Sequence, residues 1–168
     1  ISFCVLPLII IYPFMKRITW YPQLWLGVTF NWGVIVGYNS VSNNLFSMEM
    51  LTMYIGCILW TLAYDTVYGF QDIKDDKKIG IKSTSIKFKK HSKLFLLICY
   101  LLSFSCFIVT FLLMATNFLI IFFIAFIFLI ISIIIYKINL YSNMQCQKFF
   151  IFNSYFGFML TIILFYCN

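Results

Sequence analysis

Charged residues are scarce in this sequence: they make up 10% of its 168 residues, whereas hydrophobic residues make up 63%. Soluble domains contain about 25% charged and about 45 to 50% hydrophobic residues, so this composition excludes a water-soluble globule. The hydrophobic residues come in blocks of about 20, the length at which an α-helix crosses a ~30 Å hydrocarbon core. The sequence therefore predicts an all-α fold, a polytopic transmembrane helical bundle.

The sequence lacks any pair of cysteines at the C-x-x-C spacing of zinc and redox sites, although it contains six cysteines. Most of them fall within apolar runs, and we interpret them as small buried hydrophobic residues. An initial Met is also missing. The sequence begins at Ile1 inside an apolar run, without the basic flank or cleavage-like site of a signal peptide. We therefore expect residues 1–168 to be a single transmembrane domain that is truncated at its N-terminus.

Hydropathy predicts a shortened first crossing and five complete ones, which are residues 1–15, 22–41, 49–70, 94–113, 118–136 and 149–167. The twelve Lys and Arg residues all fall on alternate connections, at 16–21, 71–93 and 137–148. Basic loops of this kind lie in the cytoplasm or, for a mitochondrial protein, in the matrix. The net charge of +7 is thus explained by membrane orientation, and we expect the partners to be a lipid bilayer and no nucleic acid.

Acidic residues are rarer still, and four of the five lie within residues 65–76. Asp65 lies inside an apolar stretch, where a charge at a helix centre costs about 2.5 to 3.5 kcal/mol, so we expect it to face a wet or protein-lined cavity. If the helix continues past residue 70, its period brings four side chains to one face: Asp65, Tyr68, Asp72 and Asp76. Asp72 and Asp76 then offer oxygen ligands suited to Mg²⁺ that also binds a substrate phosphate.

A second interpretation stays open, in which the acids of 72–76 belong to a solvated loop and balance the lysines around them. Two features favour a metal and phosphate site over a solvated loop. Asp65 extends the acidic stripe into the membrane, and Lys16 and Arg17 lie on the same side of the membrane at the end of another span. Arg presents a planar fork for phosphate or carboxylate, although Lys and Arg are also common anchors at the membrane boundary.

The acidic segment is specific enough to indicate a family. Residues 64–84 read YDTVYGFQDIKDDKKIGIKST, which resembles the second aspartate-rich motif of the UbiA prenyltransferase superfamily. Residues 12–17 (YPFMKR) and 30–33 (FNWG) resemble the branch of that superfamily that prenylates 4-hydroxybenzoate. Further residues that resemble this branch are Pro22, Gln23, Gly27, Lys148, Phe149, Asn153 and Gly157.

The resemblance implies a helical bundle of about nine spans, of which about five and a half lie in this chain. It also implies an enzyme that attaches the chain of a polyprenyl diphosphate to 4-hydroxybenzoate in ubiquinone biosynthesis. Family members bind the diphosphate with Mg²⁺ and two aspartate-rich motifs, and the first motif is not found in these residues. We therefore expect a C-terminal fragment that is inactive alone. Its membrane is expected to be a bacterial or a mitochondrial inner membrane.

The resemblance also implies roles for individual residues. Asp72 and Asp76 correspond to the metal ligands of the second motif. Arg17 and, less directly, Lys16 neutralise the diphosphate or hold the carboxylate of the aromatic acid.

Asp65 and Tyr68 are expected to line the cavity or to orient the phenol. Asn31 interrupts an apolar span, and two interpretations stay open for it: a hydrogen bond between helices, or a contact with the aromatic substrate. Asn31, Tyr68 and Arg17 are accordingly the candidate substrate-binding residues.

Two other functions stay open. One is a UbiA-type transferase with another acceptor, such as haem or a naphthoate. The other is an ion-coupled or proton-coupled transporter, in which Asp65 would be the ion site. A transporter predicts acids near the middle of the membrane on more than one helix, whereas the acids here cluster at one edge.

Overall fold

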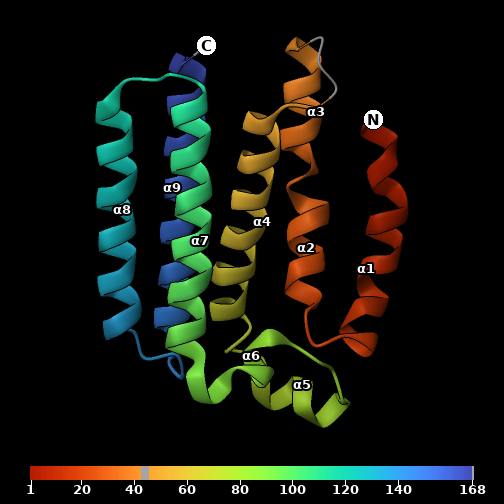
Figure 1. Ribbon diagram of the computed structural model, residues 1–168. Helices are drawn as coiled ribbons and strands as arrows, with labels where there is room; N and C mark the ends of the chain where they lie inside the picture. Colours follow the sequence, from red (N-terminus) through yellow and green to blue (C-terminus); the bar gives the residue numbers. More distant parts are fainter. Residues whose placement is uncertain (43–45, 168) are drawn as a thin grey trace.

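Helix α4 (Met48–Tyr68) lies at the centre of the structure and packs against helices on both sides of it. The computed structural model in Figure 1 describes the backbone of residues 1–42 and 46–167 and the side chains of residues 1–42 and 46–165. The other long helices are α1 (Leu6–Ile18), α2 (Pro22–Phe30), α3 (Trp32–Val41), α7 (Ser92–Leu113), α8 (Phe118–Lys137) and α9 (Asn143–Cys167). The short ones are η1 (Ser2–Val5), α5 (Ile73–Ile79), α6 (Thr84–Lys87) and η2 (Lys89–His91). The described backbone contains no strand, which confirms the predicted all-α class.

Four helical segments are long and apolar enough to cross a membrane, and they match the last four predicted crossings. They are α4, residues 89–113 around α7, α8, and α9 up to residue 165. Helix α9 begins at Asn143 and not near residue 149, which places Lys148 on the helix instead of in the loop before it. The architecture is that of an integral membrane helical bundle.

The predicted span 22–41 is not a single helix. Helix α2 ends at Phe30 and α3 begins at Trp32, with Asn31 in a turn between them. The Asn31 side chain donates to the Gly27 carbonyl (2.8 Å), which also accepts the backbone N–H of Asn31 (3.2 Å). Side chains that compete for backbone carbonyls in this way bend or interrupt helices. The prediction of one continuous crossing is therefore wrong here, although α2 and α3 together run alongside α4 (Figure 1).

The helix does not continue past residue 70 either. Helix α4 ends at Tyr68, and a turn leads into α5, which runs across the end of the bundle (Figure 1). Ser85 Oγ donates to the Thr66 carbonyl (2.7 Å). The N–H of Phe70 donates instead to the Val67 carbonyl (3.2 Å), which closes a tighter turn. Gly69 leaves room for this contact, because an added Cβ would lie 2.5 Å from Ser85 Oγ. The predicted acidic stripe on one unbroken helix is therefore wrong in its geometry.

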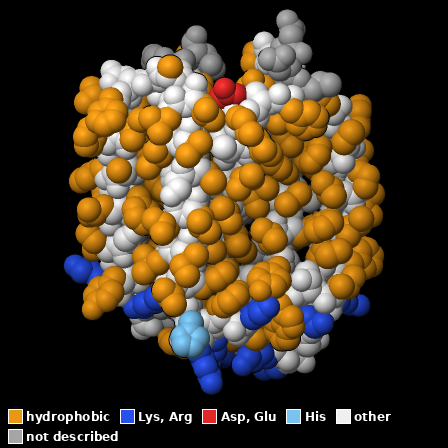
Figure 2. Space-filling view, in the orientation of Figure 1, with side chains coloured by type: hydrophobic (Ala, Val, Ile, Leu, Met, Phe, Trp, Pro, Cys, Tyr) orange, Lys and Arg blue, Asp and Glu red, His pale blue; other side chains and the backbone are white. Residues whose placement is uncertain are grey.

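Lys and Arg side chains gather at one end of the face shown in Figure 2. This end, called the basic end below, is formed by the end of α1, residues 71–93 and residues 137–148. Glu49 lies in the first turn of α4, at the opposite end. The structure thus places the basic connections together, as the sequence pattern predicts.

Cysteine labelling tests this orientation. In a cysteine-free background, Lys90→Cys should react with a membrane-impermeant reagent from the cytoplasmic or matrix side, because basic loops stay on that side. Met48→Cys should react only from the other side. Both side chains are exposed, so accessibility does not limit either reaction. The reverse pattern of labelling would contradict the orientation.

Candidate functional site

The end of α1 and the end of α4 meet at the basic end of the bundle. The ammonium group of Lys16, in the last turn of α1, lies close enough to act on the charges of both Asp65 and Asp76. The carboxylate of Asp72 acts on the same two acids. Tertiary structure therefore brings together one lysine and three acids, although the acids lie on three successive elements: α4, a turn and α5.

Asp72 and Asp76 stand one helical turn apart at the start of α5. Asp72 is the N-cap residue, and its carbonyl accepts the N–H of Asp76 (2.9 Å), which gives the two residues helical spacing. Neither carboxylate has an ion pair or a hydrogen bond within the described part of the chain. Asp75 instead pairs with Lys78 at 3.0 Å, and both side chains are 75% exposed. Asp72 and Asp76 thus differ from Asp75 in having no charged partner among the described residues.

The environment of Asp76 favours its neutral form. Partial burial raises the pKa of this carboxyl above its usual value, and the charges of Asp72 and Asp75 raise it further, while Lys16 opposes the shift. Like charges brought together in this way bind a cation more readily than an isolated carboxylate does. A cation placed between Asp72 and Asp76 would remove their repulsion.

The loop after α5 is fixed to two helices by hydrogen bonds that the sequence pattern does not reveal. The N–H of Thr84 donates to Gln23 Oε1 on α2 (3.1 Å), and the hydroxyls of Thr84 and Thr66 share a hydrogen bond of 2.6 Å. The N–H of Lys82 donates to the carbonyl of Lys16 (2.9 Å). Gln23, Thr66 and Thr84 are buried, so these bonds are shielded from water. The loop therefore holds α5 and its acids against the end of α1.

Arg17 and Tyr68 make no hydrogen bond or ion pair with any of the described acids. Arg17 is exposed and has no ion pair with any described acid. Tyr68 is 41% exposed, and its ring packs on Phe150 of α9, with 5.0 Å between ring centroids. Asp65 lies near Tyr12 and Lys16 of α1, so Asp65 and Tyr68 line different sides of the α4 end.

Asn31 makes the helix-to-helix hydrogen bond that was one of its two interpretations. Its Nδ2 donates to Thr61 Oγ1 (2.8 Å) and lies 3.3 Å from the carbonyl of Cys57, both on α4. Another bond from the same atom goes to the Gly27 carbonyl (2.8 Å). The amide hydrogens are thereby used within the protein, and only the amide oxygen remains for a substrate.

The donor set fits a hard divalent cation in part. Carboxylate oxygens are the ligands that Mg²⁺ prefers, and Asp72 and Asp76 are free of protein partners and one helical turn apart. The described residues contain no group of three or more His, Cys, Asp or Glu side chains arranged around a metal position. Two carboxylates supply only part of a six-coordinate shell.

Comparison with known proteins relates the chain to one family. The sequence pattern of the UbiA prenyltransferase family matches residues 1–161. A relative from Aedes aegypti named "4-hydroxybenzoate polyprenyltransferase, mitochondrial" is 48% identical over 91 residues, 54% of this chain and 21% of the relative. Proteins of the same name from Bos taurus (49% over 86 residues, 51% of this chain and 23% of the relative) and Dictyostelium discoideum (44% over 91 residues, 54% and 20%) are also similar.

The matched segment spans about a fifth of the length of these curated relatives. No solved structure matches the chain significantly. Proteins of the UbiA family generally use a divalent metal, in agreement with the unpartnered carboxylates of α5. Because the family pattern covers nearly all of the chain, including α1 and the acid-bearing segment, the chain belongs to the UbiA prenyltransferase family.

Proposed function

We propose that the protein to which this chain belongs transfers the prenyl group of a polyprenyl diphosphate to 4-hydroxybenzoate, in ubiquinone biosynthesis. The observation that carries this proposal is that the unpartnered carboxylates of Asp72 and Asp76 lie at the same end of the bundle as Lys16, whose charge acts on Asp76. The names of the relatives support the same reaction, and their mitochondrial location supports an inner membrane. A bacterial inner membrane fits the same fold.

The proposed diphosphate site combines cations and carboxylates. Lys16 and Arg17 bring positive charge from α1 towards the diphosphate oxygens, with Arg17 able to bind bidentately. Asp72 and Asp76 would hold Mg²⁺, which when bound neutralises the charge that develops on the departing diphosphate. The rest of the coordination shell would come from the diphosphate, from water and from carboxylates elsewhere in the protein.

In the proposed reaction, the bond between prenyl C1 and the diphosphate oxygen breaks, and diphosphate leaves with the electron pair. The ring carbon ortho to the phenolic hydroxyl then forms a bond to prenyl C1 and loses its proton. Lys16 stabilises the negative charge on the leaving group. Asp65 would help to position that ammonium group, because the charges of Asp65 and Lys16 act on each other.

The acceptor is proposed to lie between the ends of α1 and α4. Arg17 would hold its carboxylate, and Tyr68, which lies beside the ring of Phe150 on the α9 side of the α4 end, would border the acceptor from there. Asn31 is the weakest of the substrate contacts, since its amide hydrogens are bonded to Gly27 and to α4. Its remaining amide oxygen can accept a hydrogen bond from a phenol.

Acceptor competition tests the proposed function. Membranes that contain the full-length protein, with Mg²⁺ and a labelled polyprenyl diphosphate, should form a prenylated product with 4-hydroxybenzoate and not with a dihydroxynaphthoate or haem. Membranes without the protein serve as the control. Product formation with one of the other acceptors instead would identify a different branch of the family.

A further inference from the structure

A groove runs between α8 and α9, away from the proposed active site. Helix α8 packs on α7 and α9 packs on α4, whereas α8 and α9 make little contact with each other. The space left between them is a cavity of about 490 Å³. Its walls are apolar and come from both helices: Ile133, Ile134, Phe149 and Phe152. Most of the α8 and α9 surface is not covered by the rest of the chain, and the groove is open on that surface.

The groove has a polar end, and this end lies at the basic end of the bundle. Lys137 on α8 and Lys148 on α9 both line it, together with Gln145. Gln145 Oε1 accepts the N–H of Asn139 (2.8 Å), which leaves the amide hydrogens on Gln145 Nε2 as donors. Two cations and a neutral donor therefore converge on one end of an apolar channel.

The two lysines have no counter-charge. Within the described residues neither Lys137 nor Lys148 has an ion pair or hydrogen bond. Of the five acids, four belong to the segment 65–76 and Glu49 lies at the opposite end of the bundle. Orientation by the positive-inside rule explains why lysines occur at this end, but it does not require two of them to line one groove.

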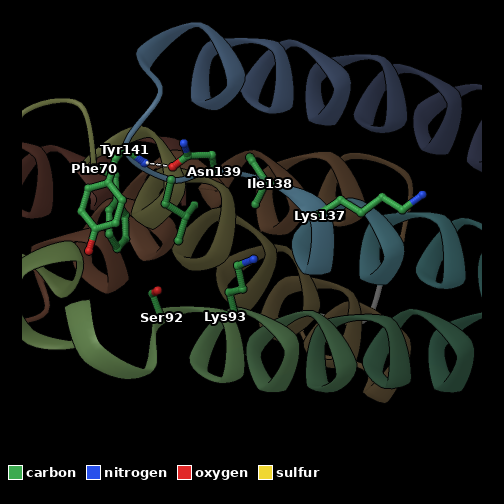
Figure 3. A pocket seen from close by; sticks show the side chains of 8 residues that line it. Phe70, Ser92, Lys93, Lys137, Ile138, Asn139 and Tyr141 are labelled. Carbon is green, nitrogen blue, oxygen red and sulfur yellow. Dashed lines mark hydrogen bonds between the residues drawn. The ribbon is translucent and has the colours of Figure 1, made fainter.

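A neighbouring cavity of about 380 Å³ is lined by both Lys137 and Lys93 (Figure 3), and the two lysines differ in their contacts. Lys93 Nζ donates to the carbonyl of Tyr136 (2.6 Å), so this lysine is used to cap the end of α8. In Figure 3 the side chain of Lys137 extends along α8, away from the other residues of this smaller cavity. Its ammonium group therefore lies away from the other residues of the smaller cavity.

We propose that the groove binds one anionic phospholipid of the surrounding bilayer. The phosphate lies between Lys137 and Lys148, and an acyl chain follows the apolar walls towards the membrane interior. Charge and hydrophobicity occur in the order in which a phospholipid presents them, headgroup at the membrane surface and chain within. Basic pockets between transmembrane helices on the cytoplasmic or matrix side are suited to anionic headgroups. A zwitterionic lipid carries its own cation, which the two lysines would repel.

Lipid binding to the full-length protein tests this proposal. The protein is extracted from its membrane in mild detergent, and binding of phosphatidylglycerol is measured by native mass spectrometry. The double variant Lys137→Gln/Lys148→Gln should bind about thirty-fold more weakly, at about 1 kcal/mol per lysine and tenfold per 1.4 kcal/mol. Lys90→Gln is the matched control, because it removes an exposed lysine from the same side of the bundle outside the groove and should change affinity less than about two-fold.

A second variant tests the contribution of the apolar groove separately from that of the lysine charges. Ile133 is 47% exposed, so Ile133→Trp fills the groove with little effect on folding and should lower lipid retention while both lysines remain. Phosphatidylcholine and inorganic phosphate are the comparison ligands. Equal binding of phosphatidylcholine, equal occupancy by phosphate alone, or unchanged lipid affinity in the double variant would each overturn the proposal.

Discussion

Replacing Asp72 or Asp76 with asparagine in the full-length protein should lower prenyl transfer on the order of 100-fold or more. These two carboxylates have no partner within the described residues, and the charge of Lys16 acts on that of Asp76. Asparagine keeps the shape but loses the charge that would hold a divalent cation. The measurement is the initial rate with 4-hydroxybenzoate and a polyprenyl diphosphate over a range of Mg²⁺ concentrations.

Asp75→Asn is the matched control for this prediction. It removes a carboxylate from the same helix, but one that pairs with Lys78 in solvent, so activity should change only a few-fold. A higher Mg²⁺ concentration should partly restore the rate of prenyl transfer by Asp72→Asn and Asp76→Asn. It should not change the rate of Asp75→Asn. Equal losses at all three positions would indicate a general effect of loop charge and would contradict the metal role of Asp72 and Asp76.

Asn153→Leu should destabilise the bundle by about 2 to 3 kcal/mol, because it leaves two buried donors without an acceptor. Asn153 Oδ1 accepts from Trp60 Nε1 and from Tyr100 Oη, each at 2.8 Å, and Asn153 is 2% exposed. One side chain of α9 thereby joins α4 and α7 in the apolar interior. The measurement is the denaturant midpoint or the thermal midpoint of the purified protein in detergent.

Two further variants show whether hydrogen bonding is responsible. Ser154→Ala changes the neighbouring exposed residue, whose hydroxyl bonds only within α9, and should leave stability nearly unchanged. Adding Tyr100→Phe to Asn153→Leu should recover part of the loss, because the stranded hydroxyl is removed together with its partner. Tyr100→Phe alone is the reference. If Tyr100→Phe lowers stability by the same amount in Asn153→Leu as in the unchanged protein, packing and not hydrogen bonding explains the result.

Hydropathy was sufficient to predict the four helices that are long and apolar enough to cross a membrane. Lipid cannot satisfy backbone hydrogen bonds, so an apolar run that crosses it has to pair its backbone groups mostly within a helix. The basic connections follow from the same local rule, since orientation is read from the charges next to each span. The segment 64–84 carried the family resemblance, which the match over residues 1–161 confirms.

Local pattern failed where a neighbouring element competes for the backbone. The span 22–41 is broken at Asn31, and α4 stops at Tyr68 where Ser85 takes the carbonyl of Thr66. Neither event follows from the period of an isolated helix, because the bonds to α4 and to the Ser85 loop join residues far apart in the sequence. The sequence pattern identified the acids as candidate site residues, but they do not share one face of a continuous helix.

The sequence by itself determined that this protein is a membrane helical bundle with its cations on one side and its acids concentrated near one span. Only the tertiary structure decided which of these charged groups meet. Lys16 reaches Asp65 and Asp76 because the loop after α5 is hydrogen-bonded to Gln23 and Thr66. Hydropathy depends on each residue's own transfer free energy, whereas such contacts depend on geometry between helices, which no single segment specifies.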